Sequence, residues 1–420
     1  MVARSFEQLS SIVSQNAAVL SRNLESQNVS SPTVQDINGQ SLSEIDSVAA
    51  TELANAAREL LALVQSPSQQ LNLLAFSMHD TASVGALIEF NIPELVPLEG
   101  TISLSELAAK AGLLEDKLAR IVRYAITNFI FHEPNPGHIA HTALSATIAR
   151  SPQLTAFLRL ALLDLAPITA AVPRALRKWP QTEATNECAV NAAYDTEDPF
   201  FQWLSRDKTR QERFDQGMVG LSSVEGKTAG RSSNIDIAAY PWGTLPSDAV
   251  VVDVGGGSGH VSKALAAAFP SFKITVQDRE PVVAAARQAG PSAVSYQVHS
   301  FMEEQPLVGA DVYFLRQVIH DWPRKEAIDI LRALTPALKP GARVLVSEFV
   351  VPDHLGDDLL EAKMVRGMDL EMMAVLNAKE RTKDEIVELF TAADSRFRFN
   401  AAHQAPEDRK VCIFEAIWDP

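Results

Sequence analysis

This 420-residue sequence has little cysteine, no long apolar run and no excess of positive charge. Its two cysteines, Cys188 and Cys412, are too few for a disulfide framework or a cysteine-rich zinc site. No apolar run approaches ~18 residues, so we expect no transmembrane helix. The first residues lack a basic-then-apolar signal pattern, because Glu7 and several serines interrupt them. We therefore expect a cytoplasmic protein that makes no membrane contact.

The balance of charge is acidic, with 37 lysines and arginines against 52 aspartates and glutamates and a net charge of -15. Generic binding to nucleic acid or to an anionic membrane requires a basic surface, so neither partner is expected. The apolar share of 46% is that of an ordinary globular chain. At roughly 150 residues per domain, this length indicates two or three domains.

Two amphipathic helices are predicted in the first segment, residues 1–66. Apolar residues follow helical spacing from Leu9 to Leu24, and again between Ser43 and Gln65, where Ser66-Pro67 ends the pattern. A polar linker, residues 25–41, separates them. These apolar faces need cover, and a second copy of the chain would supply it. We therefore expect a homodimer.

A helix, a turn, a second helix and a hairpin follow in residues 67–153. The first helix ends at Gly112, the second spans about Glu115–Asn128, and the hairpin turns at Pro134–Gly137. This order is typical of a winged helix, which often reads DNA. Because the chain is acidic, we interpret this segment as a dimerisation domain. A non-enzymatic DNA-binding regulator remains the alternative that a gel-shift assay would detect.

The pattern changes after residues 154–245, which indicate a helical connector; the family resemblance described below implies that this connector contributes to the substrate pocket. In residues 246–420, short β-branched runs alternate with helices such as Val261–Ala268 and Arg324–Leu338. This alternation predicts an α/β fold, a doubly wound parallel sheet with helices on both faces. The predicted strands are Ala249–Asp253, Lys273–Gln277, Ser295–Val298, Asp311–Leu315, Arg343–Glu348 and, pairing at the sheet, Val411–Ile417.

A glycine-rich loop follows the first of these strands. Asp253, Gly255, Gly257 and Gly259 form the pattern D-x-G-x-G-x-G. A dinucleotide loop would place its third glycine at position 260, which is His260 here. The shorter spacing resembles the S-adenosylmethionine loop of class I methyltransferases. A carboxylate such as Asp253 suits a cationic amino-acid ligand better than a pyrophosphate.

Two further residues come directly after predicted strands. Asp278 ends the second strand about 20 residues after the glycine loop, where a carboxylate can accept both ribose hydroxyls. His320 follows the fourth strand, and ligands of open α/β sheets lie beyond the carboxyl ends of strands. A histidine can take a phenolic proton near neutral pH.

The runs ADVYFLRQVIHDW, SEFVVPD, NAKERTKDEI and PFFQWLSRDKTRQERFDQGM resemble the plant caffeic-acid-type and fungal sterigmatocystin-type O-methyltransferases over most of the chain. The resemblance implies a Rossmann-like catalytic domain behind a winged-helix dimerisation domain. It also implies that His320 is the general base. By the same resemblance, Glu348 and Glu380 orient its ring, and Asp321 supports the site.

The resemblance further implies contacts with the cofactor S-adenosylmethionine and with the acceptor. Arg316 meets the cofactor carboxylate, and Phe301 and Met302 cover the adenine. Ser300 stands where the family usually has an aspartate. The residues implied for the acceptor pocket are Phe214, Met218, Trp322, Met372, Met373 and Leu376.

We therefore predict an O-methyltransferase that uses S-adenosylmethionine and acts on a phenol or enol of an aromatic, polyketide-like secondary metabolite. No metal is expected, because the base is a histidine and no carboxylate cluster with ligand spacing is present. The alternative is an enzyme of the same fold that keeps the cofactor but catalyses a pericyclic reaction or a dehydration. The intact set of His320, Glu348 and Glu380 argues against that alternative.

Overall fold

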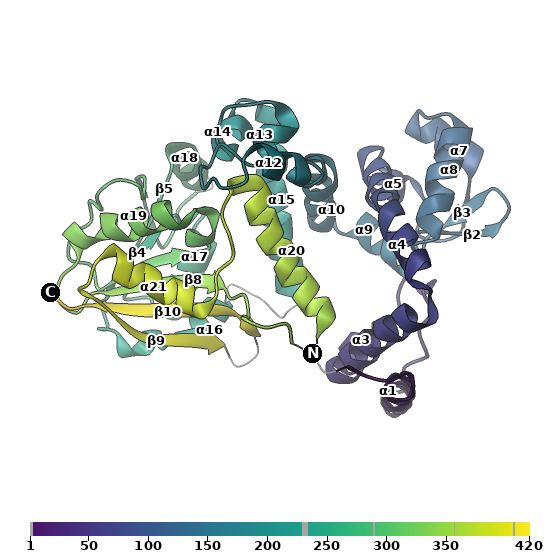
Figure 1. Cartoon of the computed structure of the whole chain (residues 1–420), viewed down its shortest axis with the longest axis horizontal. Coiled ribbons are helices and arrows are strands. Elements are labelled where there is room, and N and C mark those ends of the chain that lie inside the picture. The colour runs from purple at the N-terminus through teal and green to yellow at the C-terminus, as the bar shows by residue number, and fades with distance from the viewer. Residues whose placement is uncertain (1–2, 229–233, 289, 357, 406–407) are drawn as a thin grey trace. The chain divides into compact units, whose positions relative to one another are not determined.

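The computed structural model describes residues 3–228, 234–288, 290–356, 358–405 and 408–420 (Figure 1). The chain divides into two compact units, which are described separately below. The first comprises residues 1–167, 207–224 and 355–364, and the second comprises residues 168–206, 225–354 and 365–420. The division into four segments made from the sequence stays a prediction.

The first unit is mainly helical and carries one small sheet. Its elements are α1 (Phe6–Ser26), α2 (Leu42–Ile45), α3 (Ser47–Val64), α4 (Pro67–Phe76), α5 (Met78–Glu89), α6 (Ile92–Leu95), β1 (Ile102–Ser103), α7 (Leu104–Ala111), α8 (Glu115–Ile126), β2 (His132–Asn135), β3 (His138–Ala140), α9 (Ala143–Arg150), α10 (Pro152–Arg159), the π-helix η1 (Leu160–Leu165) and most of α15 (Lys208–Thr228).

The predicted N-terminal helices are present, but the second is broken. Asp46 adopts an extended conformation between α2 and α3, and its carboxylate accepts a hydrogen bond from the amide of Ala49, which starts α3 afresh. Helices α1 and α3 pack together, burying Leu9 and Ala56 among others. The two helices therefore cover part of their apolar faces with each other.

The helix, turn, helix and hairpin order of residues 102–140 is confirmed. Gly112 ends α7 in the left-handed conformation that glycine favours. Helix α8 buries Leu118 and Val122 against α7, and β2 and β3 form the hairpin, with β1 added at the edge in the order β1-β3-β2. The role of this segment in dimerisation stays a prediction.

The second unit contains a seven-stranded sheet. Its strands are β4 (Val250–Val254), β5 (Lys273–Asp278), β6 (Ser295–Val298), β7 (Val312–Arg316), β8 (Arg343–Phe349), β9 (Phe397–Ala405) and β10 (Asp408–Trp418). The helices are α12 (Val172–Lys178), α13 (Ala189–Tyr194), α14 (Phe200–Ser205), α16 (Asn234–Ala239), η2 (Trp242–Thr244), α17 (His260–Ala268), α18 (Glu280–Gln288), η3 (Ile319–Asp321), α19 (Arg324–Leu334), η4 (Thr335–Ala337), α21 (Lys383–Ala393) and the larger part of α20 (Leu359–Leu376); α11 (Ala166–Thr169) spans the boundary between the units.

The sheet order is β6-β5-β4-β7-β8-β10-β9, and the first five strands are parallel. Alternate residues of β4 enter different cores: Val252 packs on the side of α19 and α21, and Val251 on the side of α17. The predicted doubly wound sheet is therefore present, with helices on both faces. The predicted pairing of Val411–Ile417 at the sheet is confirmed in β10; β9 was not predicted, and both strands are antiparallel.

One stretch, Pro152–Lys178, is long and apolar enough to cross a membrane by length and composition alone, which is weak evidence for a span, so the expectation of none stays a prediction. Only 22% of its apolar window is buried. However, two of its charged side chains have polar partners: Arg159 donates to the carbonyl of Ile88, and Asp164 pairs with Arg213 through two hydrogen bonds. Several shorter helices, not one continuous α-helix, make up the stretch.

Candidate active site

The glycine loop leaves β4 and turns into α17. Gly255, Gly257 and Gly259 have φ values of 74°, 58° and 72°, a region that disfavours side chains. The loop also needs space, since a Cβ on Gly256 would lie 2.4 Å from the carboxylate of Asp253. The loop is thus a tightly folded backbone cradle at the carboxyl end of a parallel strand.

Asp253 lies beneath this loop with 2% of its surface exposed. Its carboxylate accepts a 2.6 Å hydrogen bond from the hydroxyl of Ser262, and burial raises its pKa to about 6. Asp253 therefore supports the loop from inside the fold. The direct contact with a cationic ligand that the sequence suggested stays a prediction.

Asp278 ends β5 beside the glycine loop. One carboxylate oxygen accepts from the amide of Gly257 at 2.9 Å, and the other accepts from the amide of Arg279 at 2.7 Å. A carboxylate has about four acceptor positions, so both oxygens retain capacity for ribose hydroxyls. The loop and Asp278 are thereby brought together as the sequence predicted.

The segment Ser300–Met302 approaches the loop through Phe301. The ring of Phe301 would lie 3.5 Å from a Cβ on Gly255, and it packs edge-to-face on Trp322 with ring centroids 5.8 Å apart. Met302 is 39% exposed. Trp322, which was expected at the acceptor pocket, thus contacts the residue expected to cover the adenine.

Arg316 ends β7 and has a partner that the sequence reasoning missed. Its Nε donates to the carboxylate of Asp236 at 2.7 Å, and Asp236 also accepts from the hydroxyl of Ser347 at 2.6 Å. Asp236 is 2% exposed. Because a buried carboxylate requires such partners, Asp236 fixes the direction of the Arg316 guanidinium.

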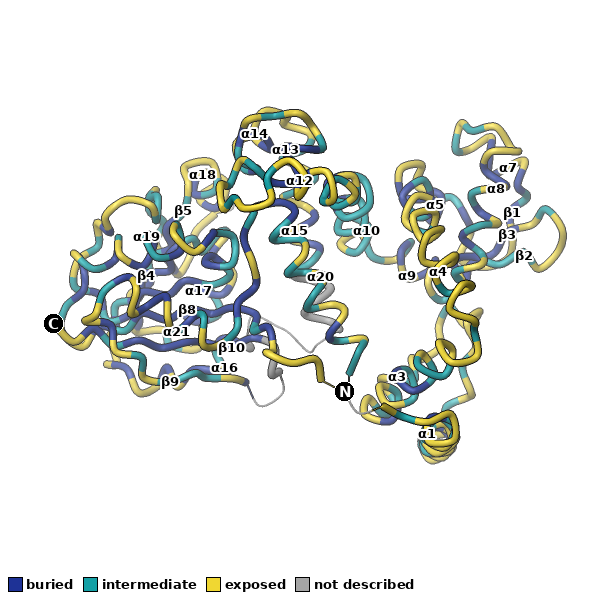
Figure 2. Tube along the Cα trace, viewed as in Figure 1, coloured by how far each residue is buried: buried dark blue, intermediate teal, exposed yellow. Residues whose placement is uncertain are grey.

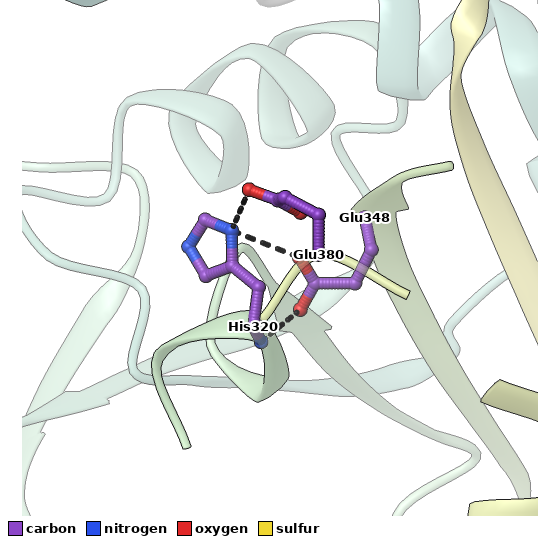
Figure 3. Close-up of side chains that lie close together, drawn as sticks. All are labelled: His320, Glu348 and Glu380. Atoms are coloured by element: carbon purple, nitrogen blue, oxygen red, sulfur yellow. Dashed lines mark hydrogen bonds and ion pairs between the residues drawn. The ribbon is translucent and has the colours of Figure 1, made fainter. Parts of the chain in front are cut away.

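Two glutamates from distant parts of the chain approach the same side of the His320 ring (Figure 3). Its Nδ1 is 2.9 Å from a carboxylate oxygen of Glu380 and 3.7 Å from one of Glu348. Glu348, on β8, also accepts from the backbone amides of Val318 and Ile319, which fixes its position. The structure therefore assembles the predicted trio.

The turn that carries His320 is held from the other side by Arg381. This guanidinium, 4% exposed, donates to the carbonyls of Ile319 and Trp322 at 2.6 Å each. The carboxylate of Asp321 lies 3.4 Å from Nε2 of His320. The sequence analysis did not predict a role for Arg381, although its position directly after Glu380 could have indicated one.

The charges around His320 hold a proton on the cluster. Burial favours the neutral ring, but Glu348, Asp321 and Glu380 together outweigh it and raise the pKa of His320 to about 10. Burial raises the pKa of Glu348 to about 7 and also raises that of Asp321. Among the described residues, no hydrogen-bond partner contacts the second carboxylate oxygen of either Glu348 or Glu380.

The same trio has a geometry that a metal ion would also accept. One ligand atom from each of His320, Glu348 and Glu380 lies within 4.8 Å of the others. One nitrogen and two carboxylate oxygens suit several divalent cations. The absence of a metal requirement therefore stays a prediction.

The residues expected around the acceptor are divided between the two units. Met372, Met373 and Leu376 lie on the part of α20 that belongs to the second unit, where Leu376 is buried. Phe214 and Met218 lie on α15 in the first unit. The common pocket that these five residues were expected to form stays a prediction.

Comparison with known proteins identifies relatives of the whole chain. The model of the O-methyltransferase domain family matches residues 174–396. A chlorophenol O-methyltransferase from Trichoderma longibrachiatum is 38% identical over 375 residues, covering 87% of this chain and 79% of the relative. The O-methyltransferase VdtC of Byssochlamys spectabilis is 34% identical over 397 residues, covering 92% and 90%.

Solved structures share the fold at lower identity. The crystal structure of OxaC superposes with a TM-score of 0.78 at 22% identity, covering 98% of this chain and all of that one. A pericyclic reaction enzyme superposes with a TM-score of 0.75 at 23% identity, covering 97% and 99%. The structure of TnmH, 27% identical, gives 0.71 and covers 85% of this chain and all of that one.

Proposed function

We propose, from the premise that the chain belongs to the O-methyltransferase family, that it methylates an aromatic hydroxyl with His320 as the general base. The observation that supports this proposal is the ring of His320 beside two buried glutamates beyond the carboxyl end of β7. The cofactor of the family, S-adenosylmethionine, supplies the methyl group as an electrophile.

The residues present fit this cofactor. The glycine loop offers a backbone cradle that tolerates no side chain at Gly256, and Asp278 stands beside it with acceptor capacity left. Arg316, held by Asp236, carries a positive charge suited to a carboxylate. We assign the ribose to Asp278, the amino-acid carboxylate to Arg316 and the adenine to the Ser300–Met302 segment.

His320 would remove the proton from the acceptor hydroxyl, which would make that oxygen a nucleophile toward the methyl group that S-adenosylmethionine would supply. Glu380 accepts a hydrogen bond from Nδ1, which leaves Nε2 as the atom that receives the proton. Glu348 and Asp321 stabilise the imidazolium once it forms. The imidazole must first lose the proton that the cluster holds, so turnover should rise with pH.

The acceptor class is inferred from chemistry and relatives together. A histidine base matches a phenol or enol, whose oxygen becomes a strong nucleophile on losing its proton. The flexible side chains of Met372 and Met373 suit a flat aromatic surface. The named activity of the chlorophenol O-methyltransferase agrees with a phenolic acceptor. We assign the natural acceptor to the aromatic, polyketide-like secondary metabolites.

The proposal includes a homodimer formed through the first unit. Large apolar side chains are exposed from the end of α3 through α4 to the start of α5 (Figure 2). Soluble monomers rarely expose such continuous patches, so a second copy is the expected cover. The patch consists of Leu61, Leu63, Val64, Leu71, Leu73, Leu74, Phe76 and Met78. We expect a cytoplasmic enzyme that binds no nucleic acid.

The test is incubation with S-adenosylmethionine and a panel of chlorophenols and polyketide phenols, followed by mass spectrometry. Methyl transfer gives a product heavier by one CH₂ unit together with an equal amount of S-adenosylhomocysteine. The pericyclase or dehydratase alternative, which the serine at position 300 keeps open, predicts turnover with no S-adenosylhomocysteine formed. Activity that survives prolonged chelation would agree with a metal-free base, and loss restored by one added cation would contradict it.

A further inference from the structure

Two buried glutamines form a reciprocal amide pair in the second unit. Nε2 of Gln277 donates to the side-chain oxygen of Gln305 at 2.8 Å, and Nε2 of Gln305 donates back to Gln277 at the same distance. The two residues are 1% and 4% exposed. Burying uncharged amides costs free energy unless they are paired, so such a pair fixes one relative geometry.

The first member of the pair holds the glycine loop. Gln277 lies on β5, one residue before Asp278, and its backbone carbonyl accepts from the amides of Gly255 at 2.8 Å and Gly256 at 3.2 Å. Its side-chain amide also donates to Gln297 on the neighbouring strand β6. A shift of Gln277 would therefore move the loop and the adjoining carboxylate together.

The second member of the pair, Gln305, lies just after the Ser300–Met302 segment, which approaches the glycine loop. Gln305 follows Ser300–Met302 by three residues, its backbone amide donates to the carbonyl of Ala333, and its side-chain oxygen accepts from Leu307. The start of the same segment is tied by the amide of His299 to the carbonyl of Asp278. Both ends of the segment are thus anchored around the end of β5.

We propose that the Gln277–Gln305 pair is a positioning device for the cofactor site. It sets the distance between the glycine loop with Asp278 and the segment that carries Phe301, and so the width of the space that receives the nucleoside. The pair touches no reacting atom. This proposal depends on binding of the family's cofactor and does not depend on the role proposed for His320.

The test separates positioning from support of the fold by using S-adenosylhomocysteine as a probe. Gln277→Leu leaves Gln305 buried without its partner, so we expect a lower melting temperature and a Kd raised about 5- to 30-fold by calorimetry. Gln277→Leu/Gln305→Leu replaces both amides by apolar groups, which should return part of the lost melting temperature, while Gln297 and the backbone amide of Leu307 still lose their partners. Under the proposal its Kd stays raised, while kcat at saturating cofactor changes less than about threefold.

The matched control is Tyr240→Phe, which removes another buried hydrogen bond in the same unit, to Glu415 at 2.7 Å. It should lower the melting temperature and leave the Kd unchanged. A double variant with a wild-type Kd would overturn the proposal, as would a Kd that follows the melting temperature across all variants. Because binding needs neither acceptor nor base, these outcomes stand apart from any failure of the catalytic proposal.

Discussion

At the scale of single residues, the charge around His320 decides when the site can act. Three carboxylates surround one imidazole, and the ring keeps its proton well above neutral pH. The same charges that would stabilise an imidazolium product thus delay its use as a base. The three carboxylates thus have two opposing effects: they stabilise the protonated ring after it accepts a proton, and they keep the ring protonated before the reaction.

Replacement of the base tests its role directly. His320→Ala should lower kcat by roughly 10²–10⁴, the usual effect of removing a positioned general base. The affinity for S-adenosylhomocysteine should stay within about threefold, and high pH should partly restore the rate because a phenol ionises unaided near pKa ~10. A variant that keeps full activity at pH 7 would exclude His320 as the base.

The pH profile tests the carboxylates. Since the pKa of His320 is raised, the proton is lost only as pH rises through about 10, and wild-type kcat/KM should increase across pH 6–9. Glu380→Gln removes one of the charges that hold the proton, so the profile should move to lower pH by roughly 1–2 units. As a control, Glu388→Gln changes an exposed carboxylate on helix α21, which begins three residues after Glu380. Identical profiles for wild type and Glu380→Gln would contradict this account.

The family resemblance was enough to name His320 and its two glutamates as one site, but it left out the residues that hold the site in place. His320, Glu348 and Glu380 were predicted together, although 60 positions separate the first from the last. Asp236 and Arg381 were not predicted, because a buried ion pair or a guanidinium on backbone carbonyls leaves no spacing pattern. Such partners become visible only when the fold brings them together.

At the scale of elements, the antiparallel edge of the sheet is held by a buried polar network. Glu415 on β10 accepts from Tyr240, Arg343, Asn400 and His403. This strand was predicted from its apolar residues, but β9 was missed. In β9 the apolar–polar alternation lasts only from Phe397 to Ala401 and breaks at Ala402, so it is too short to predict the strand.

The network predicts a pH-dependent stability. Burial opposes ionisation of Glu415, but its hydrogen bonds and Arg343 lower its pKa below the ordinary value of 4.5. A lowered carboxyl pKa contributes stability that is present above about pH 4.5 and is lost as pH falls through the folded-state value. Glu415→Leu should lower stability by roughly 3–5 kcal/mol, because it leaves Arg343 without its buried partner.

Thermal unfolding between pH 3 and 8 checks this prediction. The wild type should lose more melting temperature on acidification than Glu415→Leu does. The exposed pair of Arg396 and Asp394 provides a control, since Arg396→Ala should change stability by at most about 1 kcal/mol. Equal acid sensitivity of wild type and Glu415→Leu would show that other groups govern the transition.

At the scale of the whole molecule, the proposed homodimer depends on the apolar patch of α3–α5. Leu74 and Phe76 are 69% and 60% exposed, and no cavity or core of the described residues accounts for them. Leu74→Glu/Phe76→Glu should convert the dimer into monomers, measured by light scattering. The exposed Leu114 of the same unit, 69% exposed, gives a control in Leu114→Glu, which should remain dimeric. A dimer that survives the double change would place the interface elsewhere.

Because β10 lies inside the sheet, the sheet can be completed only late in synthesis of the chain. This strand pairs with β8 on one side and β9 on the other, yet about 60 residues separate it from the end of β8. At roughly 5–20 residues per second, a ribosome needs several seconds to cover that distance. For that interval the nascent chain carries β8, with its apolar Val344–Val346 run, as an unpaired edge open to other chains. Yield in a host cell should therefore depend on chaperone supply and translation speed.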